Sequence, residues 1–289
     1  TGGVCIAPGG TGTISGDAVI MKNTAGMYGG VSINGKLNML GGRILGNEAG
    51  QTAGVGVADN GKYVMENGLI EGNISTNGGV MASGVNIIGA AELSGGQLRY
   101  NRSIVSQDAF IPWGCGGAKL YVNGILQISG DIEISDNYVN DSFNNLYIGT
   151  GKTFTITDSL SKFIGITTQA TPTTTTPVKL AGGSGYTVKY SDWSCFSSDK
   201  SGYEILWKET EPETNPGNEL WLTVSGSCDL EGLNLSTDGA TLSPSFDPDT
   251  TRYTSTVVNS VDEIGITATL ADTASGADIT IKINDGAET

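Results

Sequence analysis

The side chains best suited to chemistry lie between residues 99 and 136. Arg99 and Arg102 flank Asn101, and Asp131, Glu133 and Asp136 follow. In an extended strand, residues 131 and 133 point to the same face, so they predict an outward acidic strip. Carboxylates beside arginine serve acid–base or calcium-assisted cleavage of polysaccharides. A secreted polysaccharide lyase or glycoside hydrolase is therefore the alternative function, although no recognisable motif frames these residues.

The chain has no histidine. This removes the commonest general base, the Ser-His and Cys-His nucleophile pairs and every zinc site that contains histidine. The cysteines show no C-x-x-C spacing, and no acidic segment has EF-hand spacing. We therefore expect no catalytic residues, no metal and no cofactor.

The best binding candidate is the segment RSIVSQDAFIPWGC (102–115), which interrupts an otherwise regular pattern. An aromatic ring in a polar loop can stack on the face of a sugar. The candidate residues are Tyr100, Arg102, Asp108, Phe110 and Trp113. The alternative stays open that Phe110 and Trp113 pack down on the body of the protein and only anchor the loop.

Composition restricts the partners and the location. The 289 residues include 44 glycines and 30 acidic against 15 basic residues, which gives a formal charge of −15. Such acidity argues against binding nucleic acid or anionic membranes, and no apolar run is long enough to insert into a bilayer. The start TGGVCIAPGG is no signal sequence, so we expect a fragment or processed form of a longer secreted or bacterial surface protein, acting as a monomer.

One pattern recurs along the first half of the chain. An apolar run ends in asparagine and is followed by a glycine pair, or its substitute, and alternating apolar residues. The asparagines are Asn23, Asn47, Asn73, Asn101 and Asn137. Successive asparagines are separated by 24, 26, 28 and 36 residues. Periods of this length without a helical pattern predict an all-β, right-handed parallel β-helix of about six coils. We expect the asparagines to stack as a hydrogen-bonded ladder, the glycines to lie at corners, and Ile44, Val55 and Val57 to face the core.

Three domains are expected: β-helix coils at 1–167, a C-terminal β cap at 168–228, and a partial β-sandwich at 229–289. The cap begins with a Thr/Pro-rich loop and contains Trp193, Trp207 and Trp221, which we expect in its core. It would cover the open end of the solenoid, which otherwise pairs with other chains.

The four cysteines allow three pairings. We predict a disulfide between Cys195 and Cys228, which implies an oxidising, extracellular location. Whether Cys5 and Cys115 pair is left open. Buried free thiols are the alternative.

Two resemblances follow from these motifs. The glycine-pair coils, with IGITTQATPTTTTPVKLAGGSGY and NELWL, resemble bacterial surface or adhesin-like β-helix repeat proteins over about 12–224. LEGLNLS, LSPSFDPDTTRY, the VV pair at 257–258 and ITATLAD resemble a bacterial cadherin-like β-sandwich, truncated at its C-terminus. This second resemblance implies core positions at Leu235, Phe246 and Tyr253. Together they imply a surface-displayed, non-catalytic module that serves as rigid spacer and binding surface. Its partner would be a host or dietary glycan, or a host surface protein.

Overall fold

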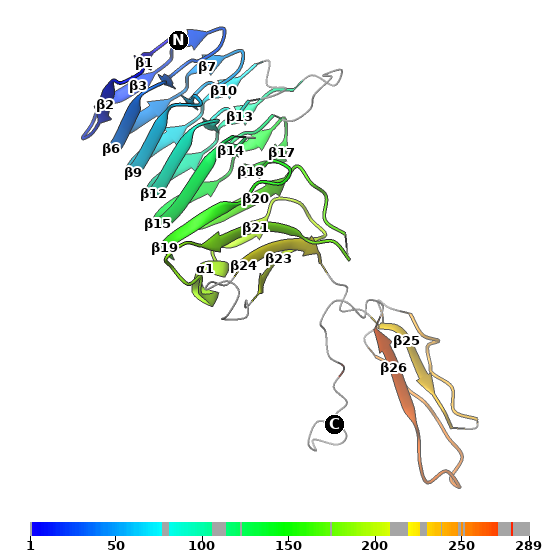
Figure 1. The fold of residues 1–289 in the computed structure, drawn as a ribbon. Helices are drawn as coiled ribbons and strands as arrows, with labels where there is room; N and C mark the ends of the chain where they lie inside the picture. Colours follow the sequence, from blue (N-terminus) through cyan, green and yellow to red (C-terminus); the bar gives the residue numbers. More distant parts are fainter. Residues whose placement is uncertain are drawn as a thin grey trace. The chain divides into compact units, whose positions relative to one another are not determined.

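In the computed structural model, the chain is nearly all β, with stacked parallel strands that form a β-solenoid of about six turns (Figure 1). This confirms the predicted fold class. The structure describes residues 2–76, 81–105, 114–121, 123–173, 175–208, 219–225, 230–237, 239–247, 250, 252–270 and 279. The chain divides into two compact units, Thr1–Thr223 and Val224–Thr289.

The strands of successive turns stack in four columns. The first column contains β1 (Val4–Ile6), β5 (Val31–Ile33), β8 (Val55–Val57), β11 (Val85–Ile87), β14 (Ala118–Leu120), β18 (Leu146–Ile148) and β20 (Ile164–Thr168). Two further columns begin with β2 (Thr11–Ile14) and β3 (Val19–Met21). They continue as the bent strands β6 (Lys36–Leu45), β9 (Lys62–Glu71), β12 (Ala90–Arg99) and β15 (Ile125–Ser135), followed by β19 (Phe154–Leu160).

A second, smaller sheet forms the fourth column. It stacks β4 (Thr24–Ala25), β7 (Glu48–Ala49), β10 (Ile74–Ser75), β13 (Arg102–Ser103) and β16 (Tyr138–Val139), and β17 (Ser142–Phe143) closes it in the antiparallel sense. All its strands but β17 come directly after the ladder asparagines. The same corner thus starts every strand of this sheet except β17.

Alternate residues of the large columns fill one continuous core. Equivalent positions of successive turns lie side by side, as with Ile33 and Val57 in the first column. The predicted core residues Ile44, Val55 and Val57 are buried there, which confirms the period-2 interpretation.

Glycine bends each long strand where two columns meet. At Gly68 the backbone has φ 120°, and a Cβ atom there would lie 3.0 Å from the carbonyl oxygen of Gly42 in the preceding turn. At Gly96 the same clash would occur with the carbonyl oxygen of Gly68, at 2.6 Å. The glycines therefore permit close stacking of the bends, as the sequence predicted for corners.

The residue before each ladder asparagine adopts a left-handed conformation. The five are Lys22, Gly46, Gly72, Tyr100 and Asp136, with φ between 52° and 64°. A Cβ atom at Gly46 or Gly72 would meet nothing within 4 Å, so this corner has room for a side chain. The side chains of the three non-glycine residues fit, but their backbone conformation costs free energy.

Replacing Lys22 with glycine is expected to raise the free energy of unfolding by about 0.5 kcal/mol, because relief of the left-handed strain exceeds the greater freedom of the unfolded chain. Urea denaturation followed by circular dichroism measures the change. The control is Lys36→Gly, at the start of β6, where glycine should destabilise by a similar amount. A stabilising Lys36→Gly or a destabilising Lys22→Gly would contradict the prediction.

The end of the solenoid after β20 is covered by further elements of the same unit. These are β21 (Val178–Gly183), α1 (Tyr190–Trp193), β22 (Phe196–Ser198), β23 (Tyr203–Lys208) and β24 (Glu219–Val224), with β24 antiparallel to β21. The buried Asp192 of α1 accepts a hydrogen bond from the Leu160 amide at 2.9 Å, which fastens the helix to β19. Trp193 and Trp207 pack against the core as predicted, whereas Trp221 lies half-buried beside Lys208.

Among the described residues of the second unit, β25 (Leu230–Leu235) pairs with β26 (Ile266–Leu270) in the antiparallel sense, and Ser243 forms an antiparallel bridge with Thr254. Leu235, Phe246 and Tyr253 are half-buried, and the rings of Phe246 and Tyr253 stack at 6.1 Å. The expected strand at 257–258 is not formed, and Val258 is 69% exposed. The structure thus shows an antiparallel sheet here.

Candidate functional site

Asparagine side chains form a continuous ladder through the interior corner of the solenoid. Each Nδ2 donates to the Oδ1 of the next asparagine at 2.8–2.9 Å, from Asn23 through Asn47, Asn73 and Asn101 to Asn137. The same Oδ1 atoms accept the backbone N–H of the preceding rung at 3.0–3.1 Å. The structure therefore brings together all five asparagines that the sequence singled out, in a structural role.

The ladder extends beyond the five asparagines to a carboxylate. Asn137 donates to Asn145 Oδ1 at 3.0 Å, and Asn145 Nδ2 donates to Asp199 Oδ1 at 2.6 Å. Asp199 Oδ2 also accepts hydrogen bonds from the Asn145 backbone N–H at 2.8 Å and from the Thr167 hydroxyl at 2.7 Å. Burial raises the pKa of Asp199, and these three hydrogen bonds oppose that rise. In the sequence, Asn144–Asn145 stands where earlier turns have a glycine pair. This substitution was the signal that the ladder ends here.

Two of the five predicted binding residues are described. Tyr100 lies 52% exposed at its corner, with the Arg99 guanidinium 5.6 Å from its ring centre. Arg102 forms an ion pair with Asp141 at 2.6 Å and lies over the ring of Tyr138. Asp108, Phe110 and Trp113 lie outside the described residues, so the binding role of the loop stays a prediction.

The candidate acid-and-arginine strip is largely engaged in pairs. Asp131 and Glu133 share the outer face of β15, on either side of the buried Ile132, as expected. Glu133 accepts a hydrogen bond from Gln97 at 2.8 Å. Arg99 pairs with Glu71 at 2.7 Å, and that hydrogen bond raises the pKa of the guanidinium further. These contacts stabilise neighbouring turns and leave Arg99 neutralised by a partner.

A polar groove of about 340 Å³ crosses the outer face of four turns, between β9 and β19. Its lining comes from alternate, outward-facing residues and from the buried Leu93 between two of them: Val64, Glu66, Glu92, Leu93, Ser94, Gln127, Ser129 and Thr157. Glu92 is paired with Lys62 at 2.6 Å, whereas Gln127 is half-buried and Glu66 is exposed. Hydroxyl, amide and carboxylate groups at strand spacing can hydrogen-bond to a hydroxyl-rich ligand. No pattern in the sequence indicated this groove.

A buried amine on the outer side of the first column was also missed. Lys119, in β14, is 1% exposed, and its Nζ lies 5.4 and 5.0 Å from the ring centres of Tyr121 and Tyr147. Burial lowers the pKa of Lys119 to about 8. Burial also raises the pKa of the neighbouring Cys115 to about 12, so that thiol stays protonated and is no nucleophile at neutral pH.

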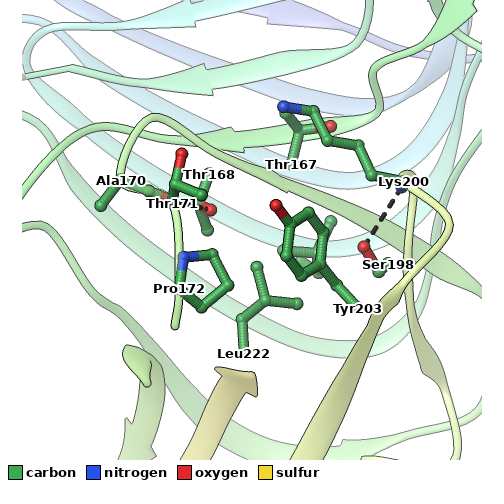
Figure 2. A pocket seen from close by; sticks show the side chains of 10 residues that line it. Thr167, Thr168, Ala170, Thr171, Pro172, Ser198, Lys200, Tyr203 and Leu222 are labelled. Atoms are coloured by element: carbon green, nitrogen blue, oxygen red, sulfur yellow. Dashed lines mark hydrogen bonds between the residues drawn. The ribbon is translucent and has the colours of Figure 1, made fainter. Parts of the chain in front are cut away.

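A small space lies between the Thr/Pro-rich segment and β23, with Pro172, Tyr203 and Leu222 around it (Figure 2). Its volume of about 10 Å³ holds at most one water molecule. It therefore serves packing of the cap and offers no room for a ligand.

The structure does not show the predicted disulfide. Cys195 is a free cysteine whose thiol donates to the Ser191 carbonyl oxygen at 3.6 Å, and Cys228 lies outside the described residues. Cys5 is free and exposed, and Cys115 is free and buried. For Cys115 the alternative of a buried thiol therefore holds.

Comparisons with the models of known families, with curated proteins and with solved structures found no match. Within the described ranges, no three His, Cys, Asp or Glu side chains cluster as metal ligands. None of the helices described is long and apolar enough to span a membrane.

Proposed function

We propose that this chain is a non-catalytic module of a secreted or bacterial cell-surface protein, acting as a rigid spacer that carries a binding surface. The observation that carries the proposal is the polar groove, which crosses four turns of one stiff solenoid. The ladder supports the spacer role, because buried amide hydrogen bonds tie each turn to the next. The adhesin-like resemblance of the coils fits the same role.

A host or dietary glycan is the ligand that the groove favours. Ser94, Ser129 and Thr157 present hydroxyl groups and Gln127 presents an amide, all of which hydrogen-bond to sugar hydroxyls without a charge. Stacked turns repeat these groups about every 4.8 Å along the groove. A linear polysaccharide can therefore meet equivalent groups on several turns, and a host surface protein is the other outcome of the test below.

The second unit fits a cadherin-like β-sandwich. The antiparallel pair β25–β26 and the stacked Phe246 and Tyr253 support this assignment. A non-catalytic role is supported by the ion pairs of Arg99 with Glu71 and of Arg102 with Asp141, since an arginine that neutralises a uronate in a lyase must face the substrate.

The binding role predicts a glycan-array signal that depends on the groove. Gln127→Ala is expected to weaken binding of the best glycan about ten-fold, because one buried hydrogen bond to the ligand is lost. Gln97→Ala is the matched control, since Gln97 lies on β12 outside the groove lining. Equal effects of both variants would remove the groove from the proposal, and Trp113→Ala tests the insertion loop separately.

The enzyme alternative is tested on the same protein. Acidic and neutral polysaccharides are incubated with the full chain and calcium, and reducing ends and unsaturated products are measured. We expect neither product above the level of a heat-denatured sample. Depolymerisation of any substrate would overturn the non-catalytic assignment.

A further inference from the structure

The polar groove on the outer face of the solenoid carries negative charge. Glu66 and Glu92 lie in its lining, and none of the lining side chains that the structure describes is lysine or arginine. Lys62 pairs with Glu92 at 2.6 Å from outside the lining. Glu66 is exposed and forms no ion pair with another described residue. On the described part of the chain, the groove therefore offers a carboxylate that no cation neutralises, in a protein of formal charge −15.

Two hydroxyl groups of the groove are set up to accept hydrogen bonds from a ligand. Ser94 donates its hydroxyl proton to the Met65 carbonyl oxygen at 3.3 Å. Thr157 donates in the same way to the Ile128 carbonyl oxygen at 3.5 Å. Each proton is thus committed to the preceding turn, while the hydroxyl oxygen keeps lone pairs for a ligand. Together with the carboxylates, these hydroxyls make a lining that matches a ligand rich in N–H donors.

The register between turns places the polar groups of the groove on neighbouring strands. Val64, Glu92 and Gln127 stand side by side on β9, β12 and β15. Glu66 follows Val64 by two residues and therefore faces the same side of the sheet. Adjacent strands lie about 4.8 Å apart, so a cation at Glu66 is within two turns of the Gln127 amide. One sugar chain can thus place a positive group at Glu66 and its hydroxyls at Gln127.

We propose that the groove prefers glycans that carry primary amino groups, such as polymers of glucosamine without N-acetyl groups. This inference rests on the proposed glycan-binding function and specifies its ligand class. The ammonium group of such a sugar brings three N–H donors and a positive charge. Glu66 binds the ammonium group, and Ser94 and Thr157 accept hydrogen bonds from neighbouring donors. Glycans rich in uronate are disfavoured, because their carboxylates would face Glu66 and Glu92.

Isothermal titration calorimetry of the full chain tests this preference with three probes of equal length. These are a glucosamine oligomer, its fully N-acetylated form and a galacturonate oligomer. At low ionic strength, and at a pH where the sugar amine is charged, we expect the glucosamine oligomer to bind about five-fold more tightly than the N-acetylated form. The galacturonate oligomer should bind more weakly than both. The preference should shrink as salt is added, because salt screens an exposed ion pair.

Glu66→Gln keeps the size of the side chain and removes its charge, so it should abolish the preference and leave binding of the N-acetylated form unchanged. Glu48→Gln is the matched control, because Glu48 is exposed on β7 outside the groove lining, and the preference should remain. Equal binding of the glucosamine and N-acetylated oligomers, tighter binding of galacturonate, or a preference that survives in Glu66→Gln would overturn this inference alone. If these oligomers and a glycan array all give no binding, the inference and the proposed function fail together.

Discussion

Replacing Asn73 with alanine is expected to lower the free energy of unfolding of the solenoid by roughly 3 to 5 kcal/mol. The side chain of Asn73 accepts two hydrogen bonds from Asn47 and donates one each to the Ile44 carbonyl and to Asn101. All four lie in the buried corner. Alanine removes the acceptor of the Asn47 backbone N–H and one donor to the Ile44 carbonyl, and water cannot replace them without opening the stack.

Chemical denaturation of the wild type and the variant, followed by circular dichroism, measures this loss. Asn60→Ala is the matched control, because Asn60 is exposed in a turn, and it should change stability by less than about 0.5 kcal/mol. Asn73→Asp separates hydrogen bonding from volume. Its second oxygen would face the Ile44 carbonyl and Asn101 Oδ1, so the substitution should cost at least as much as alanine. If Asn73→Ala lowers the free energy of unfolding by no more than Asn60→Ala does, the structural role of the ladder is contradicted.

The sequence contained most of the information for the ladder and the core. Equivalent residues such as Asn47 and Asn73 recur once per turn, and alternation within each strand assigns Ile44 to the core. Both rest on local periodicity, which any regular solenoid must repeat. A pattern of this kind predicts architecture well because each turn is an independent observation of the same corner.

The features that sequence missed depend on contacts across turns or on a break in the period. The groove arises because outward positions after the buried Met65, Leu93, Ile128 and Ile156 align, which requires the register between turns. The buried Lys119 faces outward in β14, and only its surroundings in space bury it. The ladder ends on Asp199, which lies 54 residues beyond Asn145, in the cap. No spacing rule links those two positions.

The end of the ladder leads to the second large effect. Replacing Asp199 with asparagine is expected to lower the free energy of unfolding at pH 7 by roughly 2 kcal/mol. Asparagine keeps one of the two accepting oxygens and turns an NH2 group toward a donor. That donor is either the side-chain Nδ2 or the backbone N–H of Asn145. Asp59→Asn, in an exposed turn, removes the same charge without such contacts and is the control.

The pH dependence of this difference has a definite sign. Because burial raises the folded-state pKa of Asp199 above its unfolded value, the folded chain holds a proton that the unfolded chain has lost. The stability due to this group is therefore complete below the unfolded pKa of about 3.9 and decreases as the pH rises through the folded pKa. Asparagine does not titrate. The other carboxylates contribute equally to the pH dependence of stability in both proteins, so their contributions cancel in the difference.

The stability of the wild type minus that of Asp199→Asn should thus fall as the pH rises from below 4 toward neutrality. Urea unfolding at a series of pH values measures both proteins under the same conditions. A difference that instead rises with pH would mean that the hydrogen bonds from Asn145 and Thr167 outweigh burial and lower the pKa. The ladder would then end on a carboxylate stabilised in its charged form. A flat difference would mean that the two effects balance at Asp199.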